Sequence, residues 1–460
     1  MARRSSWTCW RSPGWMKARF LVLPLLFVVA TSAQAAERDP VKDFVTGYIA
    51  KNRIPGVALL VRRQGRVIRA EGYGMANLEH RVPVKPETAF QSGSMGKQFT
   101  AMAVMTLVDE GKLALDDPVS KYLDAPAEWK GITVRHLLTH TSGLGDYPEA
   151  FPMQKDATED EELKMAMAQK LLFAPGEKWS YSNLGYLTLG ALIHKVSGKF
   201  YGDLLAERVF RPLGMTRTRI ISESDIVPDR AAGYRMIDGE IKNQEWVAPS
   251  LNTTADGSLY FTVLDLAKWD EALEAGKIVS KSSYDAMWSP VRLNDGSAEP
   301  YGFGWGIHRA ANGHRLIEHT GSWQGFTTYI GRYPDDRLTV AVLCNMADAT
   351  PSYIGRRVAG VYDATLVPPP RKSVKLDAAK VKHFAGVYQL EEHRLTIGVL
   401  GPAGRLQAKT QGLSRELVPG SETDFFEEDA DRTYHFVVQD GAVTGVEVAV
   451  PEKLVFRKVE

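Results

Sequence analysis

A run of three prolines divides this sequence into two parts with different residue patterns. The run, at positions 368–370, lies in a short segment of mostly apolar and basic residues, 366–372. Proline has no backbone N–H to donate and fixes φ, so three in succession cannot continue a helix or a central strand. We therefore predict a linker at residues 366–374, with one domain before it at 36–365 and another after it at 375–460.

The part after the linker is typical of short strands separated by turns. Three segments alternate apolar and polar residues, and Asp440-Gly441 is a turn signal between two of them. The alternating residues are Leu395, Ile397 and Val399, then Tyr434, Phe436 and Val438, then Val446, Val448 and Val450. Because this part has no dense cluster of His, Cys and acidic residues, we expect a small all-β, barrel-like accessory domain without catalytic residues.

The part before the linker mixes hairpin and helix patterns. Hairpins are predicted at 57–70 around Gln64-Gly65, at Asn312-Gly313, and at 327–344. Helices are predicted from Ser94 to a glycine at 111, from 183 to 197, and over 264–275 after a Thr262 cap. These patterns predict an α/β (α+β) domain with several antiparallel strands.

The N-terminus resembles an export signal. Five basic residues precede an apolar run at 20–30, which is followed by small residues ending in Ala33-Gln34-Ala35. We predict that residues 1–35 are a cleaved signal peptide; an uncleaved anchor is the alternative. Cleavage removes five basic and no acidic side chains, which changes the formal net charge from +1 to −4. We expect a periplasmic or secreted protein without an integral membrane span after signal removal.

Composition excludes several partners and linkages. The 56 basic and 55 acidic side chains leave no basic surplus to neutralise phosphates, so we expect no nucleic-acid partner. The two cysteines are Cys9, in the predicted signal, and Cys344, so the mature chain has no internal disulfide. The partner that we expect is a small-molecule or peptide substrate, and the oligomeric state is left open.

Several catalytic signatures are absent from the sequence. It contains no G-x-x-x-x-G-K-[ST] phosphate loop, no H-E-x-x-H zinc helix and no G-x-S-x-G elbow, since Ser92 stands where the first glycine is needed. His136 and His140 are four residues apart and can share a helix face, but no third metal ligand is suggested nearby. We therefore expect no metal and no cofactor.

The tetrapeptide Ser94-Met95-Gly96-Lys97 is the one Ser-x-x-Lys in the chain. With Ser94 at the start of a helix, Lys97 lies one turn along the same face, which brings its amine within reach of the serine hydroxyl. Serine becomes a good nucleophile when a neighbouring base takes its proton. The spacing therefore predicts a reactive serine, although an ordinary capped helix is the simpler alternative.

Two further elements follow in order: Tyr181-Ser182-Asn183 and His319-Thr320-Gly321. With them, the sequence resembles the serine β-lactamase and penicillin-binding protein superfamily, particularly its class C-like branch of esterases and D-peptidases. The three elements look like that family's S-x-x-K, Y-x-N and K-T-G boxes, and the segments 111–118 and 132–144 fit as well. The resemblance covers residues 42–360 and implies an antiparallel sheet flanked by helices, a mostly helical subdomain, and an active site between them.

The resemblance also implies roles for individual residues. Ser94 would be acylated, Lys97 would help to deprotonate it, and Tyr181 would share the work of the base. Asn183 would hold the substrate's carbonyl or amide. The backbone N–H groups of Ser94 and Ser322 would form the oxyanion hole.

The third box departs from the family's commonest pattern, because His319 stands in the place of lysine. A histidine with an ordinary pKa near 6.5 is mostly neutral at pH 7, whereas lysine offers a permanent charge to a substrate carboxylate. The substrate-binding set implied here is Asn183, His319, Thr320, Gly321 and Ser322, with Trp323 as a candidate pocket wall.

The sequence thus predicts an exported serine hydrolase that cleaves an ester or amide through an acyl-enzyme on Ser94. A small ester, a D-amino-acid peptide and a cell-wall peptide are the candidate substrates. The alternatives are a β-lactamase proper, which His319 disfavours, and a penicillin-binding sensor or scaffold that does not turn over.

Overall fold

The computed structural model describes residues 38–148, 151–390, 393–400, 404–410, 413–428, 430–450 and 452–460. The predicted signal peptide, residues 1–35, lies outside the described residues. Residues Pro40–Glu460 form one compact unit that contains every element described below. No described helix combines the length and apolar character that a membrane span requires.

A seven-stranded antiparallel sheet joins the early and late strands of the first part of the chain. In order across the sheet, its strands are β11 (Gly306–Arg309), β12 (Arg315–Trp323), β13 (Phe326–Tyr333), β14 (Leu338–Cys344), β1 (Gly56–Arg63), β2 (Arg66–Asn77) and β3 (Val82–Pro83). Strand β1 pairs with β14, so Val57 lies opposite Cys344. The three predicted hairpins are confirmed as β1–β2, β11–β12 and β13–β14.

Most helices lie in sequence between the early and late strands of the sheet. In chain order, the described α-helices are α1 (Pro40–Lys51), α2 (Lys97–Asp109), α3 (Val134–Leu138), α4 (Glu159–Met167), α5 (Asn183–Ser197), α6 (Tyr201–Leu205), α7 (Val263–Ala275), α8 (Lys281–Met287), α9 (Pro351–Tyr362) and α10 (Ala378–Lys382). Thr262 caps α7 by accepting the backbone N–H of Asp265, which confirms the predicted cap. The helix predicted from Ser94 begins at Lys97 instead, because residues 93–96 form the 3₁₀ turn η1 (Gly93–Gly96).

Short strands and 3₁₀ turns connect these helices. The strands are β4 (Phe90–Gln91), β8 (Leu259–Phe261) and β5 (Arg219–Ile220) in one small sheet, with the pairs β6 (Tyr234–Ile237) and β7 (Glu240–Asn243), and β9 (Val291–Arg292) and β10 (Ala298–Glu299). Strand β4 leads directly into η1, and its partner β8 follows the loop 255–258. The small sheet therefore anchors both segments beside Ser94.

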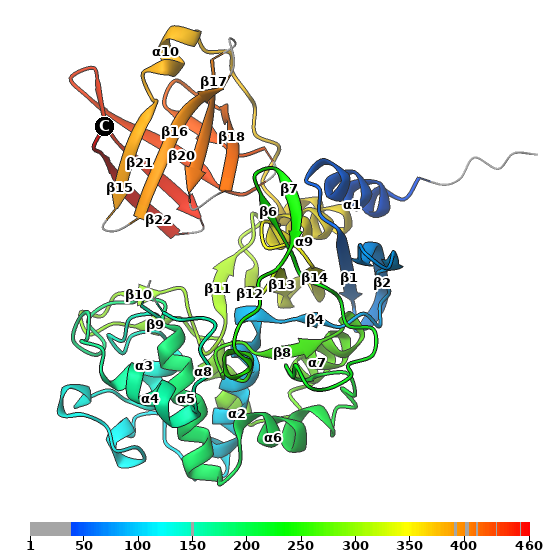
Figure 1. The fold of residues 1–460 in the computed structure, drawn as a ribbon, viewed down its shortest axis with the longest axis vertical. Coiled ribbons are helices and arrows are strands. Elements are labelled where there is room, and N and C mark those ends of the chain that lie inside the picture. The colour runs from blue at the N-terminus through cyan, green and yellow to red at the C-terminus, as the bar shows by residue number, and fades with distance from the viewer. Residues whose placement is uncertain are drawn as a thin grey trace, which may run out of the picture. The chain divides into compact units, whose positions relative to one another are not determined.

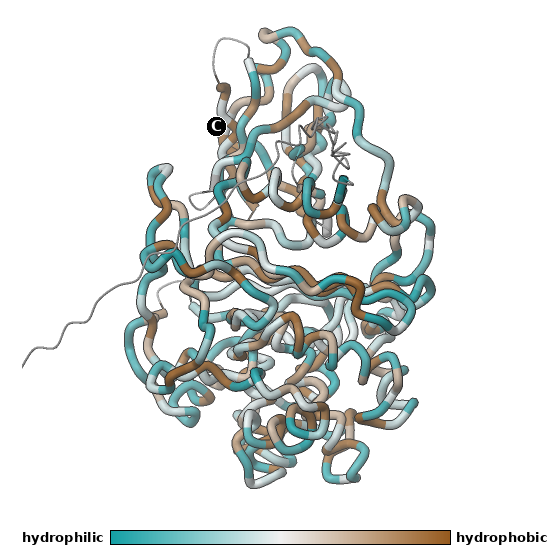
Figure 2. Tube along the Cα trace, turned by 90° about the vertical axis from the view of Figure 1, so that its right-hand side faces the viewer, coloured by the Kyte–Doolittle hydropathy of each residue, from teal (hydrophilic) through white to brown (hydrophobic). Residues whose placement is uncertain are grey.

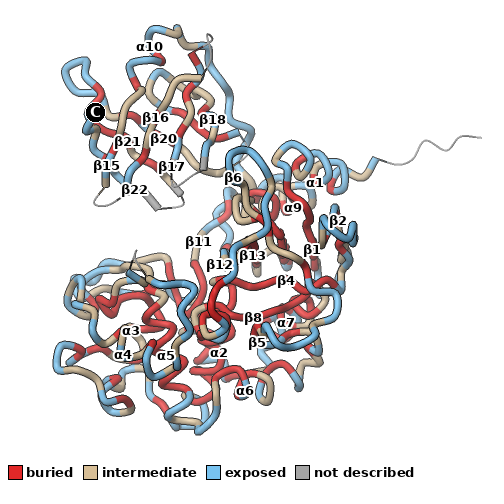
Figure 3. The backbone as a smooth tube through the Cα atoms, viewed as in Figure 1, coloured by how far each residue is buried: buried red, intermediate tan, exposed pale blue. Residues whose placement is uncertain are grey.

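The seven-stranded sheet has helices on both faces (Figure 1). Val57 and Leu59 of β1 share a core with residues of α1 and α9, whereas Ala58 and Leu60 share a second core with residues of α2 and α7. Strand β1 is buried on both sides, while β2 keeps many exposed residues (Figure 3). The predicted fold, an antiparallel sheet flanked by helices with a mostly helical region, is confirmed.

The C-terminal strands close into an eight-stranded barrel. They are β15 (Gly386–Leu390), β16 (His393–Leu400), β17 (Arg405–Thr410), β18 (Leu413–Pro419), β19 (Asp424–Phe426), β20 (Thr433–Gln439), β21 (Ala442–Val450) and β22 (Glu452–Lys458). Hydrophobic residues recur along the strands of sheet and barrel (Figure 2). Tyr434 and Phe436 point into the barrel core, but a register shift after Val437 leaves Val438 43% exposed. The predicted barrel is confirmed, and the domain boundary at 366–374 stays a prediction.

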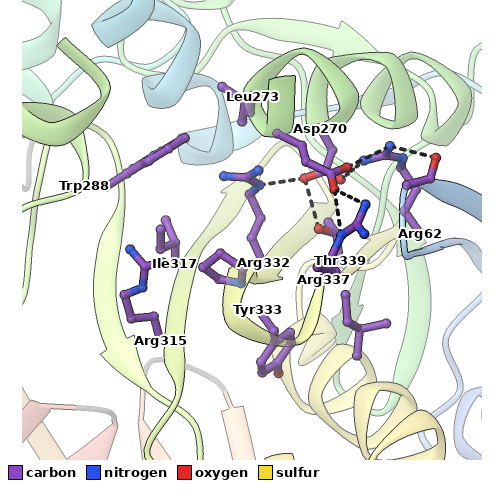
Figure 4. A pocket seen from close by; sticks show the side chains of 14 residues that line it. Arg62, Asp270, Leu273, Trp288, Arg315, Ile317, Arg332, Tyr333, Arg337 and Thr339 are labelled. Atoms are coloured by element: carbon purple, nitrogen blue, oxygen red, sulfur yellow. Dashed lines mark hydrogen bonds and ion pairs between the residues drawn. The ribbon is translucent and has the colours of Figure 1, made fainter. Parts of the chain in front are cut away.

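A buried ionic cluster, which we call the Asp270 cluster, joins α7 to strands β1, β13 and β14. Asp270 pairs with Arg62 and, at 2.6 Å, with Arg332, and it accepts a 3.0 Å hydrogen bond from Thr339. The side chains of both arginines and of Asp270 are at most 7% exposed. Beside them lies a cavity of about 310 Å³ that Trp288 also lines (Figure 4).

Candidate active site

Ser94 is the accessible residue of an otherwise buried segment. Within residues 88–107, every residue except Ser94 is buried. In the 3₁₀ turn η1, residues three apart stack almost directly above one another, so Lys97 lies over Ser94. The Nζ of Lys97 is 3.1 Å from the Oγ of Ser94, which is the contact that the Ser-x-x-Lys spacing predicts.

Lys97 is fully buried, and neutral oxygens surround its amine. Its Nζ donates to Asn183 Oδ1 at 2.6 Å and to the backbone oxygen of Asp256 at 2.5 Å, in addition to its contact with Ser94. Among the described residues, these three oxygens are its hydrogen-bond partners. The amine is thus held in place by hydrogen bonds to neutral oxygens and without a carboxylate ion pair.

Tyr181 meets Lys97 with its ring and not with its hydroxyl. The Nζ of Lys97 lies 4.9 Å from the centre of the Tyr181 ring. The hydroxyl of Tyr181 is buried and has no hydrogen-bond partner among the described residues. The structure therefore brings the second predicted box to the first, but it places no hydrogen bond between Tyr181 and Ser94.

Asn183 connects the buried lysine to an exposed carboxylate. It is the first residue of α5, behind the cap residue Ser182, so its side chain projects from the end of the helix. While its Oδ1 accepts from Lys97, its Nδ2 donates to Asp146 Oδ2 at 3.1 Å. Asp146 is exposed and had no motif to mark it in the sequence.

His319 is buried on β12 and bonded to its neighbours. Its Nδ1 faces the backbone oxygen of Thr320 at 2.5 Å, so this nitrogen carries the proton, and its Nε2 accepts from the Tyr301 hydroxyl at 2.9 Å. Burial, followed by the nearby charge of Lys97, lowers the pKa of His319 to about 4. The side chain is therefore neutral at pH 7, as its sequence position suggested, and it has no free N–H for a ligand.

Close backbone packing holds η1 against β12. Gly93 has a φ of +52°, and a Cβ there would lie 2.4 Å from the backbone nitrogen of Ser322. A Cβ on Gly321 would lie 2.1 Å from the backbone oxygen of Ser92, so both positions require glycine. This packing places Ser94 and Ser322 on the wall of one cavity.

That cavity measures about 430 Å³ and opens over Ser94. Four of the predicted site residues line it: Ser94, Asn183, Ser322 and Trp323. Trp323 is held by a 2.8 Å hydrogen bond from its Nε1 to Asn252. The other residues that line the cavity were not among the predicted site residues: Gly93, Asp146, Tyr147, Pro148, Phe151, Met153, Leu251, Thr254, Asp256, Gly257 and Ser258. His319, Thr320 and Gly321 lie outside this lining.

The sequence predicted no role for the loop 255–258. In the structure, its backbone supplies one of the three acceptors for Lys97, at Asp256. Ser92 holds the loop in place, because its hydroxyl donates a 2.6 Å hydrogen bond to the backbone oxygen of Gly257. Since these contacts use backbone atoms, residue identity alone gave no signal for them.

The two histidines considered as metal ligands have other partners. Nδ1 of His136 accepts the backbone N–H of Thr133 at 3.2 Å, and Nδ1 of His140 accepts that of Ser182 at 3.1 Å. The described part of the chain contains no group of three or more His, Cys, Asp or Glu side chains that could hold a metal ion.

Comparisons with known proteins agree with this geometry. A model of the beta-lactamase family matches residues 41–361. Penicillin-binding protein 4* of Bacillus subtilis (strain 168) is 32% identical over 394 residues, which are 80% of this chain and 87% of that protein. A D-aminopeptidase of Brucella anthropi is 31% identical over 301 residues, which are 63% of this chain but 56% of that protein.

Among solved structures, the octameric penicillin-binding protein homologue from Pyrococcus abyssi is similar to this chain with a TM-score of 0.69 and 29% identity. The match covers 91% of this chain and 99% of that chain. Family model, relatives and fold thus agree with the Ser94–Lys97 contact: the chain belongs to the beta-lactamase family, and it is a serine hydrolase of the β-lactamase-related type.

Proposed function

We propose that this serine hydrolase cleaves an ester or an amide through an acyl-enzyme on Ser94. The observation that carries the proposal is the 3.1 Å contact between Lys97 Nζ and Ser94 Oγ, with Ser94 on the wall of an open cavity. Covalent catalysis of this kind needs a base within hydrogen-bond reach of the nucleophile, and Lys97 meets that requirement.

In the first half-reaction, the amine form of Lys97 takes the hydroxyl proton of Ser94 while the serine Oγ forms a bond to the carbonyl carbon of the substrate. The proton then passes to the leaving nitrogen or oxygen when its bond to carbon breaks. Tyr181, whose ring contacts Lys97, is the group that we assign to this transfer. Water next attacks the acyl-enzyme, and its proton returns through the same groups as the acid leaves and Ser94 is restored.

We assign the oxyanion hole to the backbone N–H groups of Ser94 and Ser322. The close packing of Gly93 against Ser322, and the position of both serines on the cavity wall, support this assignment. Two such donors stabilise the charge that develops on the carbonyl oxygen, and losing one costs about 3–4 kcal/mol of barrier.

The charges in the cavity favour a substrate with an amino group over one with a carboxylate. The lining contains the carboxyl groups of Asp146 and Asp256 but no Lys, Arg or His. Burial raises the pKa of Asp256, so the exposed Asp146 is the main anion offered to a ligand. We therefore propose a D-amino-acid amide or ester with a free amino group as substrate, consistent with the similarity to D-aminopeptidases.

A matched pair of chromogenic substrates tests this preference. We expect D-alanine p-nitroanilide to be cleaved with a kcat/KM at least about tenfold above that of its N-acetyl derivative, because a charge-assisted hydrogen bond contributes about 1.5–3 kcal/mol. Asp146→Asn should abolish the difference. Equal rates for both substrates in the wild type would refute the amino-group preference and leave the acyl-enzyme proposal standing.

The nucleophile is tested by intact-protein mass after treatment with a fluorophosphonate and, separately, with a penicillin. We expect a fluorophosphonate adduct in the wild type and none in Ser94→Ala. A penicillin adduct that persists for hours would support the sensor alternative, rapid turnover of penicillin would support a β-lactamase, and absence of any adduct in folded wild type would refute the reactive serine.

We also propose that the protein works outside the cytoplasm. Support comes from the basic and apolar N-terminal segment with its Ala33-Gln34-Ala35 ending. N-terminal sequencing of the protein recovered from the periplasm or medium should begin at residue 36. Recovery of the full-length chain from the cytoplasm alone would contradict the proposal.

A further inference from the structure

His140 holds the backbone on both sides of Tyr181. The backbone N–H of Ser180 donates to the backbone oxygen of His140 at 2.9 Å. The backbone N–H of Ser182 donates to the ring nitrogen Nδ1 of the same histidine at 3.1 Å. One residue from the loop after α3 therefore binds both chain neighbours of the proposed proton-transfer group.

The ring of His140 also packs on the ring of Tyr181. Their centres are 4.2 Å apart with an angle of 34° between the planes, and Tyr301 covers the histidine at 4.8 Å. His140 is 1% exposed. Burial, followed by the nearby Lys97, lowers the pKa of His140 well below its ordinary value, so the ring stays neutral and Nδ1 remains an acceptor.

The backbone at His140 adopts a conformation that costs energy. Its φ is +60°, in the left-handed region that non-glycine residues seldom occupy. The following residue, Thr141, accepts the backbone N–H of Gly176 at 2.8 Å, so the loop is bound to the 176–182 segment at three places. A strained residue whose ring and carbonyl both serve the same neighbouring segment is the arrangement expected for positioning.

We propose that His140 is a positioning residue that sets the orientation of the Tyr181 ring against Lys97 and so controls the rate of acylation. The proposal rests on the proposed function, in which Tyr181 moves the proton. It does not make His140 a catalytic residue, because its ring contacts Tyr181 and has no contact with Ser94 or Lys97 among the described hydrogen bonds.

Two amide variants separate the contribution of the acceptor from that of side-chain volume. In His140→Asn, the oxygen on Cγ takes the place of Nδ1, and asparagine tolerates positive φ. In His140→Gln, the amide is one carbon farther away and the acceptor is lost from that place. The control is His136→Asn, a change of the same residue type on α3, just before the His140 loop, at a residue that does not contact Tyr181.

The measured quantities are the rate of Ser94 labelling by a fluorophosphonate and the kcat and KM for p-nitrophenyl acetate. We expect His140→Gln to lower kcat and the labelling rate about 30- to 100-fold with little change in KM, since a displaced catalytic group can cost about 100-fold. We expect His140→Asn to recover to within about fivefold of the wild type, and His136→Asn to match the wild type.

A double-mutant cycle with Tyr181→Phe distinguishes positioning from general destabilisation. If His140 acts through Tyr181, adding His140→Gln to Tyr181→Phe slows labelling by no more than about twofold. The proposal would be overturned if His140→Gln slowed labelling in the Tyr181→Phe background by as large a factor as in the wild type. It would also be overturned if folded His140→Gln had the wild-type kcat. If His140→Gln does not fold, His140→Asn is used in its place. The proposal is then overturned if His140→Asn slows labelling by the same factor in the Tyr181→Phe background as in the wild type.

The proposed function fails separately. If the fluorophosphonate does not label Ser94 in the wild type, the acyl-enzyme proposal is wrong. If labelling depends on Ser94 but Tyr181→Phe labels at the wild-type rate, the role assigned to Tyr181 is wrong. If Tyr181→Phe labels slowly but the His140 variants label at the wild-type rate, only the positioning role of His140 is refuted.

Discussion

Two buried charged groups of this molecule are stabilised in opposite ways. In the Asp270 cluster, one carboxylate lies between Arg62 and Arg332, so cation and anion meet inside the protein (Figure 4). At the active site, the equally buried Lys97 is surrounded by the neutral oxygens of Ser94, Asn183 and Asp256. In the cluster, opposite charges offset the cost of burying one another, whereas the lysine amine is held by hydrogen bonds to neutral oxygens alone.

Two further buried groups show a third solution, in which the group gives up its charge. Glu162 is 5% exposed, and burial raises its pKa to about 8. His319 is 8% exposed, and burial lowers its pKa to about 4. Both are therefore mostly neutral near pH 7. The comparison shows that the structural cluster is paired, while the buried lysine beside the reacting serine has no ion pair.

The largest expected effect comes from Lys97→Met. Removing the base should slow fluorophosphonate labelling of Ser94 by about 10³-fold or more, because positioned bases contribute about 10² to 10⁴ in rate. Stability should change little, since a buried side chain without an ion pair is replaced by an apolar chain of similar length. Labelling kinetics and urea unfolding of the same samples measure the rate and the stability. A loss of more than about 3 kcal/mol in the free energy of unfolding would contradict the distinction between Lys97 and the Asp270 cluster.

Asp270→Asn should have the reverse profile. It leaves Arg62 and Arg332 buried without their shared anion, which typically costs about 3–5 kcal/mol of the free energy of unfolding. Labelling of Ser94 per folded molecule should stay at the wild-type rate. If the variant unfolds with the wild-type midpoint, the cluster is not the structural element that we describe.

Glu162→Gln should remove a pH dependence of stability. Between pH 4.5 and about 8, the folded protein keeps a proton that the unfolded chain releases, so the free energy of unfolding falls as pH rises through this window. We expect the wild type to lose about 4–5 kcal/mol from this group by pH 8 and the variant to be relatively stabilised there. Urea unfolding of the wild type and the variant at pH 5 and pH 8.5 measures this loss. If both proteins lose the same free energy of unfolding between these pH values, Glu162 is not the group responsible.

His319→Gln tests the opposite sign with a smaller effect. Between about pH 4 and 6.5, the unfolded chain binds a proton that the folded protein does not, so stability rises with pH and is fully present above 6.5. We expect a contribution of about 3 kcal/mol that the variant lacks. Unfolding curves at pH 4.5 and 7 decide the question, and an equal acid sensitivity in the variant would show that His319 is not the group responsible.

Local patterns in the sequence predicted most of the elements. The three hairpins, the Thr262 cap and the barrel strands each depend on residues close together in the chain, and all are present. The exceptions have local physical causes. The 3₁₀ turn at Gly93–Gly96 moved the start of α2 to Lys97, and a shift in strand register exposed Val438.

The sequence by itself determined the fold class and the Ser94–Lys97 pair, because a spacing of three residues on a helical turn brings two side chains together without help from the rest of the chain. Only the tertiary structure decided what surrounds that pair. Asp146 and His140 reach the site from the loop after α3, and the Asp256 carbonyl reaches it from the loop before β8; His140 and Asp256 both use backbone atoms. Backbone groups are the same in every residue, so their role is set by where the folded chain places them.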